Sequence, residues 1–127
     1  IIAIEGLNIL MIHSRKNNMK GMPLIYTGNL DEFTNDYKTY NVDIILFGHT
    51  HEKLYIEHNN KLFINPGSLG CSKKGTVDFA ILEISNKILK NCIFKSLEYD
   101  KLNLIKDYND KSVPDKEFLM QTFYKIN

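Results

Sequence analysis

The sequence predicts an α/β fold, and two observations carry that prediction. Short apolar runs of the kind that form buried strands, Leu7 to Ile12 and Ile44 to Phe47, flank a segment with helical periodicity. Further along, apolar runs of strand length occur in pairs separated by short polar segments, which is the pattern of β-hairpins. The chain is therefore expected to begin with a strand-helix-strand unit and to continue with hairpins.

The first strand is expected over Leu7 to Ile12, because this run is apolar, rich in branched side chains and of strand length. The helix that follows rests on an apolar stripe at helical spacing. Asn29 is expected to cap it, with Glu32 three residues later as in a capping box, so Gly28 to Glu32 is interpreted as a turn and helix start. The stripe consists of Leu30, Phe33, Tyr37 and Tyr40.

Two hairpins are expected after the second apolar strand. Lys53 to Ile56 pairs with Lys61 to Ile64 in the first of them. Val77 to Ile84 pairs with Ile88 to Phe94 in the second, around a turn at Ser85-Asn86-Lys87.

The C-terminal part is expected to be helical. Leu102 to Tyr108 forms a short helix, and a last helix begins near Pro114, shortly after Ser112. The side chains that line one face of this last helix are Phe118, Leu119, Thr122, Phe123 and Ile126. No internal repeat or second domain is visible, so residues 1–127 are interpreted as a single domain.

Histidines follow both early strands. His13 comes directly after the first, and His49 and His51 come two residues apart after the second. Imidazole nitrogens are common ligands of divalent metals, and strand ends are where α/β proteins place their chemistry. Alternate residues of a strand share a face, but Gly48 permits a turn, so two neighbouring metals are an alternative to one. We predict His13, His49 and His51 as metal ligands.

An isolated His-x-His pair is more often ordinary than metal-binding, and only the strand-end context favours a site here. Thr50 between the histidines is expected to turn the loop and to bond to the backbone. His58 lies in the polar tip Glu57 to Lys61 and is interpreted as a solvent-exposed hairpin residue, not a ligand.

A second turn, Asn65-Pro66-Gly67-Ser68, also follows an apolar strand. Its open backbone amides and its hydroxyl suit an anion, so Asn65, Gly67 and Ser68 are predicted to bind phosphate. The glycine-rich loop after it contains two lysines. This loop is either merely solvated, or Lys73 or Lys74 helps to attract an anionic substrate.

Composition excludes several other classes of function. With 127 residues, 43% hydrophobic content and 16 basic against 15 acidic side chains, the chain fits one globular domain without a nucleic-acid patch. Its apolar runs are far below the roughly 18 residues of a membrane span, and no signal peptide is recognisable. Cys71 and Cys92 lack paired-ligand spacing, so we expect reduced thiols and a cytoplasmic location. A homo-oligomer is compatible with this composition.

The block Phe47-Gly48-His49-Thr50-His51, followed after a hairpin by Asn65-Pro66-Gly67-Ser68, resembles the C-terminal part of a calcineurin-like metallophosphoesterase. More narrowly, it is similar to the small bacterial and archaeal phosphodiesterases of that superfamily. The resemblance covers about Leu7 to Tyr99. It implies a four-layer αββα sandwich, of which this chain supplies the C-terminal part.

The resemblance also implies an activity. The family hydrolyses phosphate esters, here most simply a phosphodiester, through a hydroxide shared by two divalent ions such as Mn, Zn, Ni or Fe. By the family pattern His13 and His49 ligate one ion and His51 the other. Because imidazole must be neutral to ligate, acid pH is expected to weaken metal binding. The implied partner is the phosphate-ester substrate.

The chain departs from the family pattern in one important respect. The Asp-x-His, Gly-Asp and Gly-Asn-His motifs of the family's N-terminal half do not occur in these 127 residues, and Asp43 and Glu52 occupy no family ligand position. We therefore expect this chain alone to be inactive. The alternative function, from a different class, is a retromer-type protein-binding scaffold on the same fold, although the tail from Leu102 to Asn127 argues against it.

Overall fold

The structure, a computed structural model, describes residues 1–14, 30–72 and 74–125. The expected helix cap Asn29, the loop residue Lys73 and the helix-face residue Ile126 lie outside these ranges. Within the described residues, no helix is long and apolar enough to cross a membrane.

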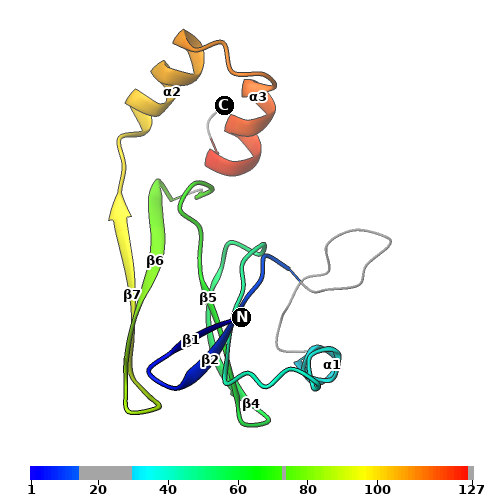
Figure 1. Ribbon diagram of the computed structural model, residues 1–127. Coiled ribbons are helices and arrows are strands. Elements are labelled where there is room, and N and C mark those ends of the chain that lie inside the picture. The colour runs from blue at the N-terminus through cyan, green and yellow to red at the C-terminus, as the bar shows by residue number, and fades with distance from the viewer. Residues whose placement is uncertain (15–29, 73, 126–127) are drawn as a thin grey trace.

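The centre of the fold is a mixed sheet that contains the expected early strands (Figure 1). Three of its strands are parallel to one another, and an antiparallel strand lies at each edge. In spatial order the strands are β1 (Ile2–Ile4), β2 (Leu7–Met11), β3 (Ile44–Leu46), β5 (Lys61–Pro66) and β4 (Lys53–His58). The expected strand-helix-strand unit and the first hairpin are confirmed.

The three parallel strands end in line with one another. In their register Met11 is paired with Leu46, and Leu46 is paired with Ile64. The residues that follow therefore leave the sheet at one edge, where the Gly48 N–H donates to the His13 carbonyl at 3.0 Å. This alignment brings His13, the His49 loop and the Asn65 turn to the same place.

One face of the sheet is covered by the helix α1 (Leu30–Asp36). Its apolar stripe packs on the sheet as the sequence predicts, and Phe33 is completely buried. The helix ends at Asp36 and not at Tyr40, because the following backbone closes with tighter three-residue bonds from Tyr37 and Lys38. The buried residues of this layer are Leu10, Leu30, Phe33, Tyr37, Val42, Ile45, Phe47 and Phe63.

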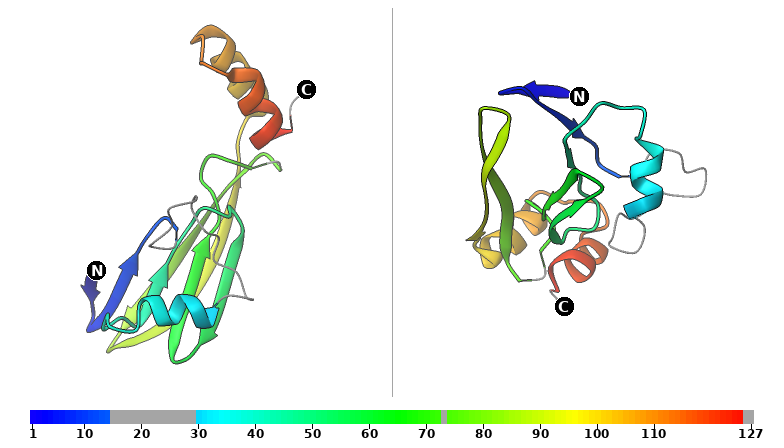
Figure 2. Two further views of the ribbon diagram at one scale, coloured as in Figure 1. Left: turned by 90° about the vertical axis from the view of Figure 1, so that its right-hand side faces the viewer. Right: turned by 90° about the horizontal axis from the view of Figure 1, so that it is seen from below.

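The other face of the sheet is covered by a long hairpin, β6 (Thr76–Ser85) with β7 (Ile88–Glu98), which forms a second sheet (Figure 2). It turns at Asn86 and Lys87, both with positive φ, as two-residue hairpins require. Ile9, Ile44 and Ile64 of the first sheet pack against the hairpin's inner side chains. The described residues thus form the helix, sheet and sheet layers of the expected sandwich.

The C-terminal segment forms α2 (Lys101–Asp110), α3 (Lys116–Leu119) and η2 (Met120–Tyr124), which lie beyond the end of the hairpin (Figure 1). Tyr124 is buried between the rings of Tyr99 and Tyr108. Burial, together with the hydrogen bond with Tyr108, raises the pKa of Tyr124.

The expected face of the last helix is wrong in part. Phe118 is 63% exposed, whereas Tyr124, which was not assigned to that face, is buried. Thr122 of the same predicted face is exposed as well, and it lies in the π-helical turn that begins at Met120.

Candidate metal centre

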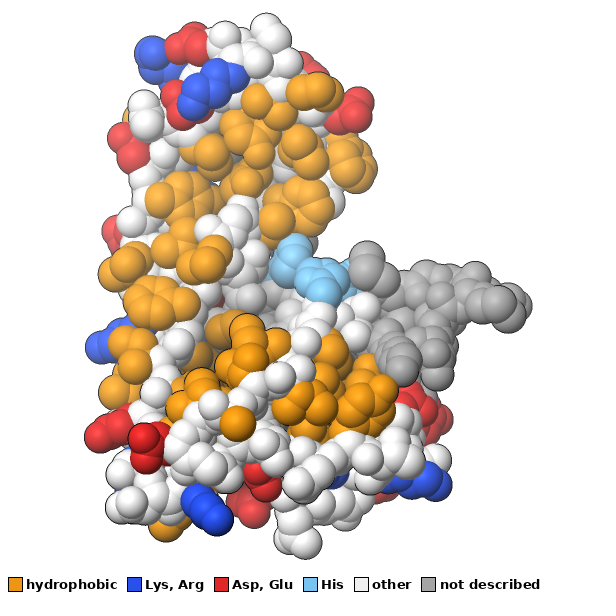
Figure 3. All heavy atoms as spheres, in the orientation of Figure 1, with side chains coloured by type: hydrophobic (Ala, Val, Ile, Leu, Met, Phe, Trp, Pro, Cys, Tyr) orange, Lys and Arg blue, Asp and Glu red, His pale blue; other side chains and the backbone are white. Residues whose placement is uncertain are grey.

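His13 and His49 meet at the edge where the parallel strands end. The Nε2 atom of His13 lies 3.2 Å from the Nδ1 atom of His49, and the two rings stand edge to face with centroids 5.1 Å apart. Figure 3 shows histidine side chains in the hollow between the C-terminal helices and the sheets. The strand register explains this contact, since both residues follow neighbouring strands that end together.

The distance between these nitrogens is compatible with a shared metal ion. Two ligands of one tetrahedral ion lie about 3.4 Å apart when each bond is about 2.0–2.1 Å long. His13 is exposed and His49 is half-buried, so an ion could reach both. No group of three or more His, Cys, Asp or Glu side chains able to hold a metal occurs among the described residues. The pair therefore offers at most two of the ligands that a metal ion at this edge would need.

The loop that carries His49 and His51 has an unusual backbone. Both histidines have positive φ, 74° and 59°, whereas Gly48 does not. The sequence predicts that Gly48 permits a turn here, and in the structure the left-handed positions of this loop belong to the two histidines. As a result His51 points to a different neighbour, with its ring 6.1 Å from that of Phe123 in the C-terminal segment.

Asn65 ties the second turn to the histidine loop. Its side chain is completely buried, and its Nδ2 donates to the Thr50 Oγ1 at 2.8 Å and to the Gly48 carbonyl at 3.2 Å. Its Oδ1 accepts from the Gly67 N–H at 3.0 Å. All three bonds join protein groups, so Asn65 positions the two turns relative to each other. The expected backbone role of Thr50 is confirmed.

Gly67 and Ser68 complete the turn. Gly67 has a φ of 97°, and a Cβ added there would lie 2.6 Å from the Asp78 Cβ. Both the backbone conformation and the lack of space for a side chain therefore require glycine at this position. The Ser68 Oγ accepts from the Gly70 and Cys71 N–H groups, which leaves its own hydrogen free to donate. The Ser68 carbonyl accepts from the Asp78 N–H at 2.8 Å and anchors the turn on β6.

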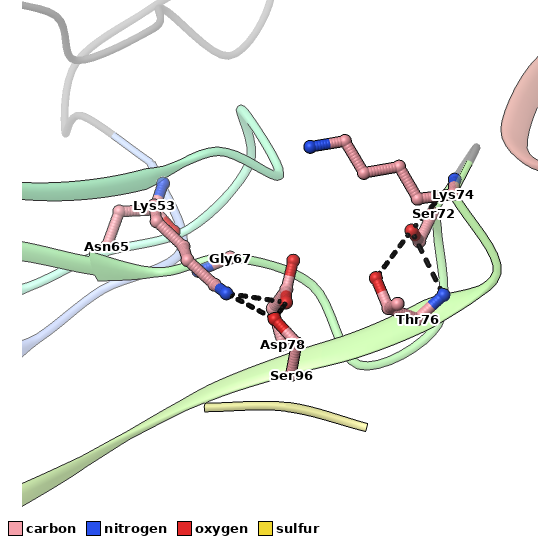
Figure 4. A network of polar contacts seen from close by, with 8 residues as sticks. All are labelled: Lys53, Asn65, Gly67, Ser72, Lys74, Thr76, Asp78 and Ser96. Atoms are coloured by element: carbon pink, nitrogen blue, oxygen red, sulfur yellow. Dashed lines mark hydrogen bonds and ion pairs between the residues drawn. The ribbon is translucent and has the colours of Figure 1, made fainter. Parts of the chain in front are cut away.

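A charged network joins the two sheets beside this turn (Figure 4). The Lys53 Nζ of β4 lies 2.8 Å from the Asp78 Oδ1 of β6 and 2.6 Å from the Ser96 Oγ of β7, and the Ser96 hydroxyl donates to Asp78. Burial alone would raise the pKa of Asp78. The hydrogen bonds from Lys53 and Ser96 outweigh that effect and hold the pKa of this carboxyl below its ordinary value.

These elements enclose a cleft of about 790 Å³, which we call the site cleft. Its walls come from the histidine loop, the loop before β6, the hairpin strands and the C-terminal segment, with His51, Lys53, Lys74 and Phe123 among its lining side chains. Sequence reasoning missed Lys53, Asp78 and Phe123 as site residues. The position of Lys53 two residues after His51 was the one available signal.

Two further titratable residues considered from the sequence, His58 and Asp43, have structural partners. His58 bonds to the Asp31 Oδ1 of α1 at 2.7 Å, and this hydrogen bond lowers the pKa of Asp31. His58 is half-buried, so its expected full exposure is wrong, although it lies in the hairpin as predicted. Asp43 accepts from the Asn8 N–H at the far end of β3. Cys71 and Cys92 are free thiols.

Paired imidazoles lie at the carboxyl ends of parallel strands, above a sandwich of two sheets, and this is the edge at which open α/β sheets bind their ligands. Residues 1–87 match the calcineurin-like phosphoesterase superfamily domain. The chain therefore belongs to that superfamily, as its sequence motifs predicted.

Solved structures agree on the fold. A hypothetical protein from Pyrococcus horikoshii is similar with a TM-score of 0.74 at 18% identity, over 99% of this chain and 50% of that one. A metallophosphoesterase from Sphaerobacter thermophilus gives 0.63 at 19% identity, over 86% and 53%. Vps29 from Entamoeba histolytica, solved as a zinc complex, gives 0.50 at 22% identity, over 78% and 59%. The chain thus spans about half the length of the first two structures.

Proposed function

We propose that the protein is a metal-dependent phosphoesterase that acts on phosphodiesters, and that this chain supplies His13, His49 and His51 to a centre of two divalent ions. The observation that carries the proposal is the approach of the His13 and His49 nitrogens to 3.2 Å at the edge of the sheet. Membership of the calcineurin-like phosphoesterase superfamily supports it. The zinc complex of the similar Vps29 structure supports a divalent ion, with Mn, Ni and Fe as further candidates.

Each part of the chain has a role in this proposal. His13 and His49 hold one ion and His51 the other, as neutral imidazoles. When bound, such ions neutralise phosphate charge and activate water for attack on phosphorus. Asn65 holds the two turns in register, and Ser68, which has a spare hydroxyl hydrogen, donates to a phosphate oxygen near Gly67.

The test uses the full-length protein loaded with manganese and an aromatic phosphodiester as substrate. His49→Ala and His51→Ala should each lower turnover by at least about 100-fold, since removing even a group behind a metal ligand typically costs 10–100-fold. Metal content should fall in parallel, while circular dichroism stays unchanged. His58→Ala is the matched control, because His58 bonds to Asp31 and not to the site.

Wild-type metal content and turnover in the His49 and His51 variants would refute the proposed ligands. A full-length protein without any phosphodiesterase activity, whose partner binding tolerates both substitutions, would instead favour the retromer-type scaffold.

A further inference from the structure

Of the three candidate ligands, only His51 lines the site cleft, whereas His13 lines a separate cavity of about 300 Å³. The volume of the site cleft, about 790 Å³, lies within the range of pockets that enclose a small organic molecule, whereas a phosphate group alone needs far less room. The cleft runs from His51 to the loop before β6. If the phosphate lies at the histidines, as the proposed function requires, the remaining space is available to the organic group of the ester.

The cleft lining carries two lysines, Lys53 and Lys74, and two carboxylates, Glu52 and Asp78, so its formal charges sum to zero and only their pairing differs. The charges of both lysines help to lower the pKa of Asp78. Lys53 is neutralised by Asp78, with which it forms an ion pair at 2.8 Å. Glu52 belongs to the histidine loop. Lys74 comes from the loop before β6, is exposed, and has no ion pair with another described residue. In Figure 4 its side chain extends toward the side of the cleft that holds Lys53 and Asp78.

A second donor lies on the same wall as Lys74. The Ser72 Oγ accepts from the Lys74 N–H at 3.2 Å and from the Thr76 N–H at 3.4 Å. With both lone pairs occupied, the Ser72 hydroxyl must donate its hydrogen, and the Thr76 Oγ1 lies 3.2 Å away to accept it. The Thr76 hydroxyl hydrogen is then free to donate into the cleft, which Thr76 lines.

The opposite wall is aromatic. Phe123, from the π-helical turn of the C-terminal segment, places its ring beside that of His51 and lines the cleft. An aromatic ring beside His51 in the lining suits a flat, apolar body that carries a polar end.

We infer that the site cleft binds the organic group of the phosphate ester and selects one that carries an anionic substituent, held by the Lys74 ammonium and the Thr76 hydroxyl. The preferred substrates are thus esters of an aromatic or similarly flat alcohol with a carboxylate or a second phosphate at its far end. This inference rests on the proposed function for the position of the ester phosphate, but it concerns binding and can be tested without turnover.

The test measures binding of two product monoesters to the full-length protein by calorimetry. 4-Carboxyphenyl phosphate and 4-carbamoylphenyl phosphate have the same shape and differ in the charge of one substituent. The wild type should bind the carboxylate about tenfold more tightly, because a hydrogen bond to a charged group contributes about that factor. Lys74→Ala should abolish the difference, and 1,4-phenylene bisphosphate would show whether a second phosphate binds better than the carboxylate.

Two further variants serve as controls. Lys90→Ala removes a lysine near the β6–β7 turn and should keep the tenfold preference. Phe123→Leu should weaken both monoesters to a similar degree, since the aromatic face contacts the shared ring. Equal affinity of the wild type for the two monoesters, or an unchanged preference in Lys74→Ala, would overturn the inference. If the wild type bound the carboxylate monoester more tightly but hydrolysed no phosphodiester, only the proposed function would be refuted.

Discussion

The side chain of Asn65 is completely buried, and each of its polar atoms has a partner. It connects the Gly48 carbonyl and Thr50 hydroxyl of one turn to the Gly67 amide of the next. A buried amide that joins two loops fixes their separation more tightly than packing alone, because every misplacement leaves a donor or acceptor unpaired. The geometry of the histidine loop therefore depends on Asn65, whose three side-chain hydrogen bonds are all to other residues of this chain.

Asn65→Asp is expected to destabilise the full-length protein by about 1–3 kcal/mol or more, since a carboxylate would face the Gly48 carbonyl and lose both donated bonds. Urea unfolding measures the change. Asn41→Asp, at an exposed position before β3, is the control and should be nearly neutral. Equal stability of the two variants would contradict the proposed role of Asn65.

Two glycines of the same loop region provide a matched comparison. Gly67→Ala should cost about 1–3 kcal/mol, because alanine is strained at a φ of 97° and its Cβ would overlap Asp78. Gly70→Ala should cost little, because no atom lies within 4 Å of the added Cβ. Thermal unfolding and phosphodiesterase turnover of both variants test this. Similar losses at the two positions would show that the loop responds to any substitution.

At the scale of single residues, sequence reasoning placed the histidines and the second turn correctly near each other, but it did not find their partners. The apolar strand, the glycine and the histidines from Ile44 to His51 are adjacent in the sequence, so their pattern can be recognised without knowledge of the fold. The partners of Lys53, by contrast, are Asp78 and Ser96, which come from strands of the other sheet. Such a contact depends on how two sheets are stacked, and no local pattern encodes that.

Among the secondary structure elements, the register of the three parallel strands decides where the site lies. Leu46 of β3 aligns with Met11 of β2 and with Ile64 of β5. The loops that follow these three strands therefore begin next to one another at the same edge of the sheet. Apolar runs of similar length made this arrangement predictable. The π-helical turn from Met120 was not predictable, because the apolar residues around it fit an ordinary α-helix equally well.

The Lys53, Asp78 and Ser96 network links the two sheets and should depend on pH. Because the pKa of Asp78 is lower in the folded protein, its stabilising effect is complete above the ordinary value of 3.8 and is lost as the pH falls through the lowered value. Asp78→Asn should cost about 1 kcal/mol at neutral pH, a figure limited by partial exposure of the pair.

The measurement compares unfolding free energies of Asp78→Asn and wild type at about pH 7 and at the lowest pH where both remain folded. The difference should shrink on acidification, following the linkage between protonation and stability. Asp115→Asn, which removes a carboxylate that makes no cap hydrogen bond, provides the control. A difference that stays constant with pH would exclude Asp78 as the titrating group.

For the molecule as a whole, the hairpin has two apolar faces, and the described residues cover only one of them. Its inner face packs on the first sheet, whereas Ile81, Ile93 and Leu97 on the outer face are 49%, 39% and 56% exposed. Figure 3 shows hydrophobic side chains along this side and over the C-terminal helices. Exposed apolar surface of this kind favours association.

Residues 1–127, purified alone, are expected to bind at most one divalent ion weakly, to show no appreciable phosphodiesterase activity and to self-associate. The reason is that the described residues bring two imidazoles together but no third ligand, and two ions need a bridging anionic oxygen that neutral histidines lack. Manganese titration by calorimetry, a phosphodiester assay and sedimentation velocity test the three statements. Tight binding of two equivalents with turnover would contradict them.

The left-handed backbone at His49 and His51 has a consequence for the history of this loop. A residue with a Cβ costs about 1–2 kcal/mol in that conformation, and glycine would relieve it. A protein under pressure only to resist heat would therefore drift toward glycine at both positions. Both positions instead carry imidazoles, so this loop holds two side chains in a conformation that lowers the stability of the fold.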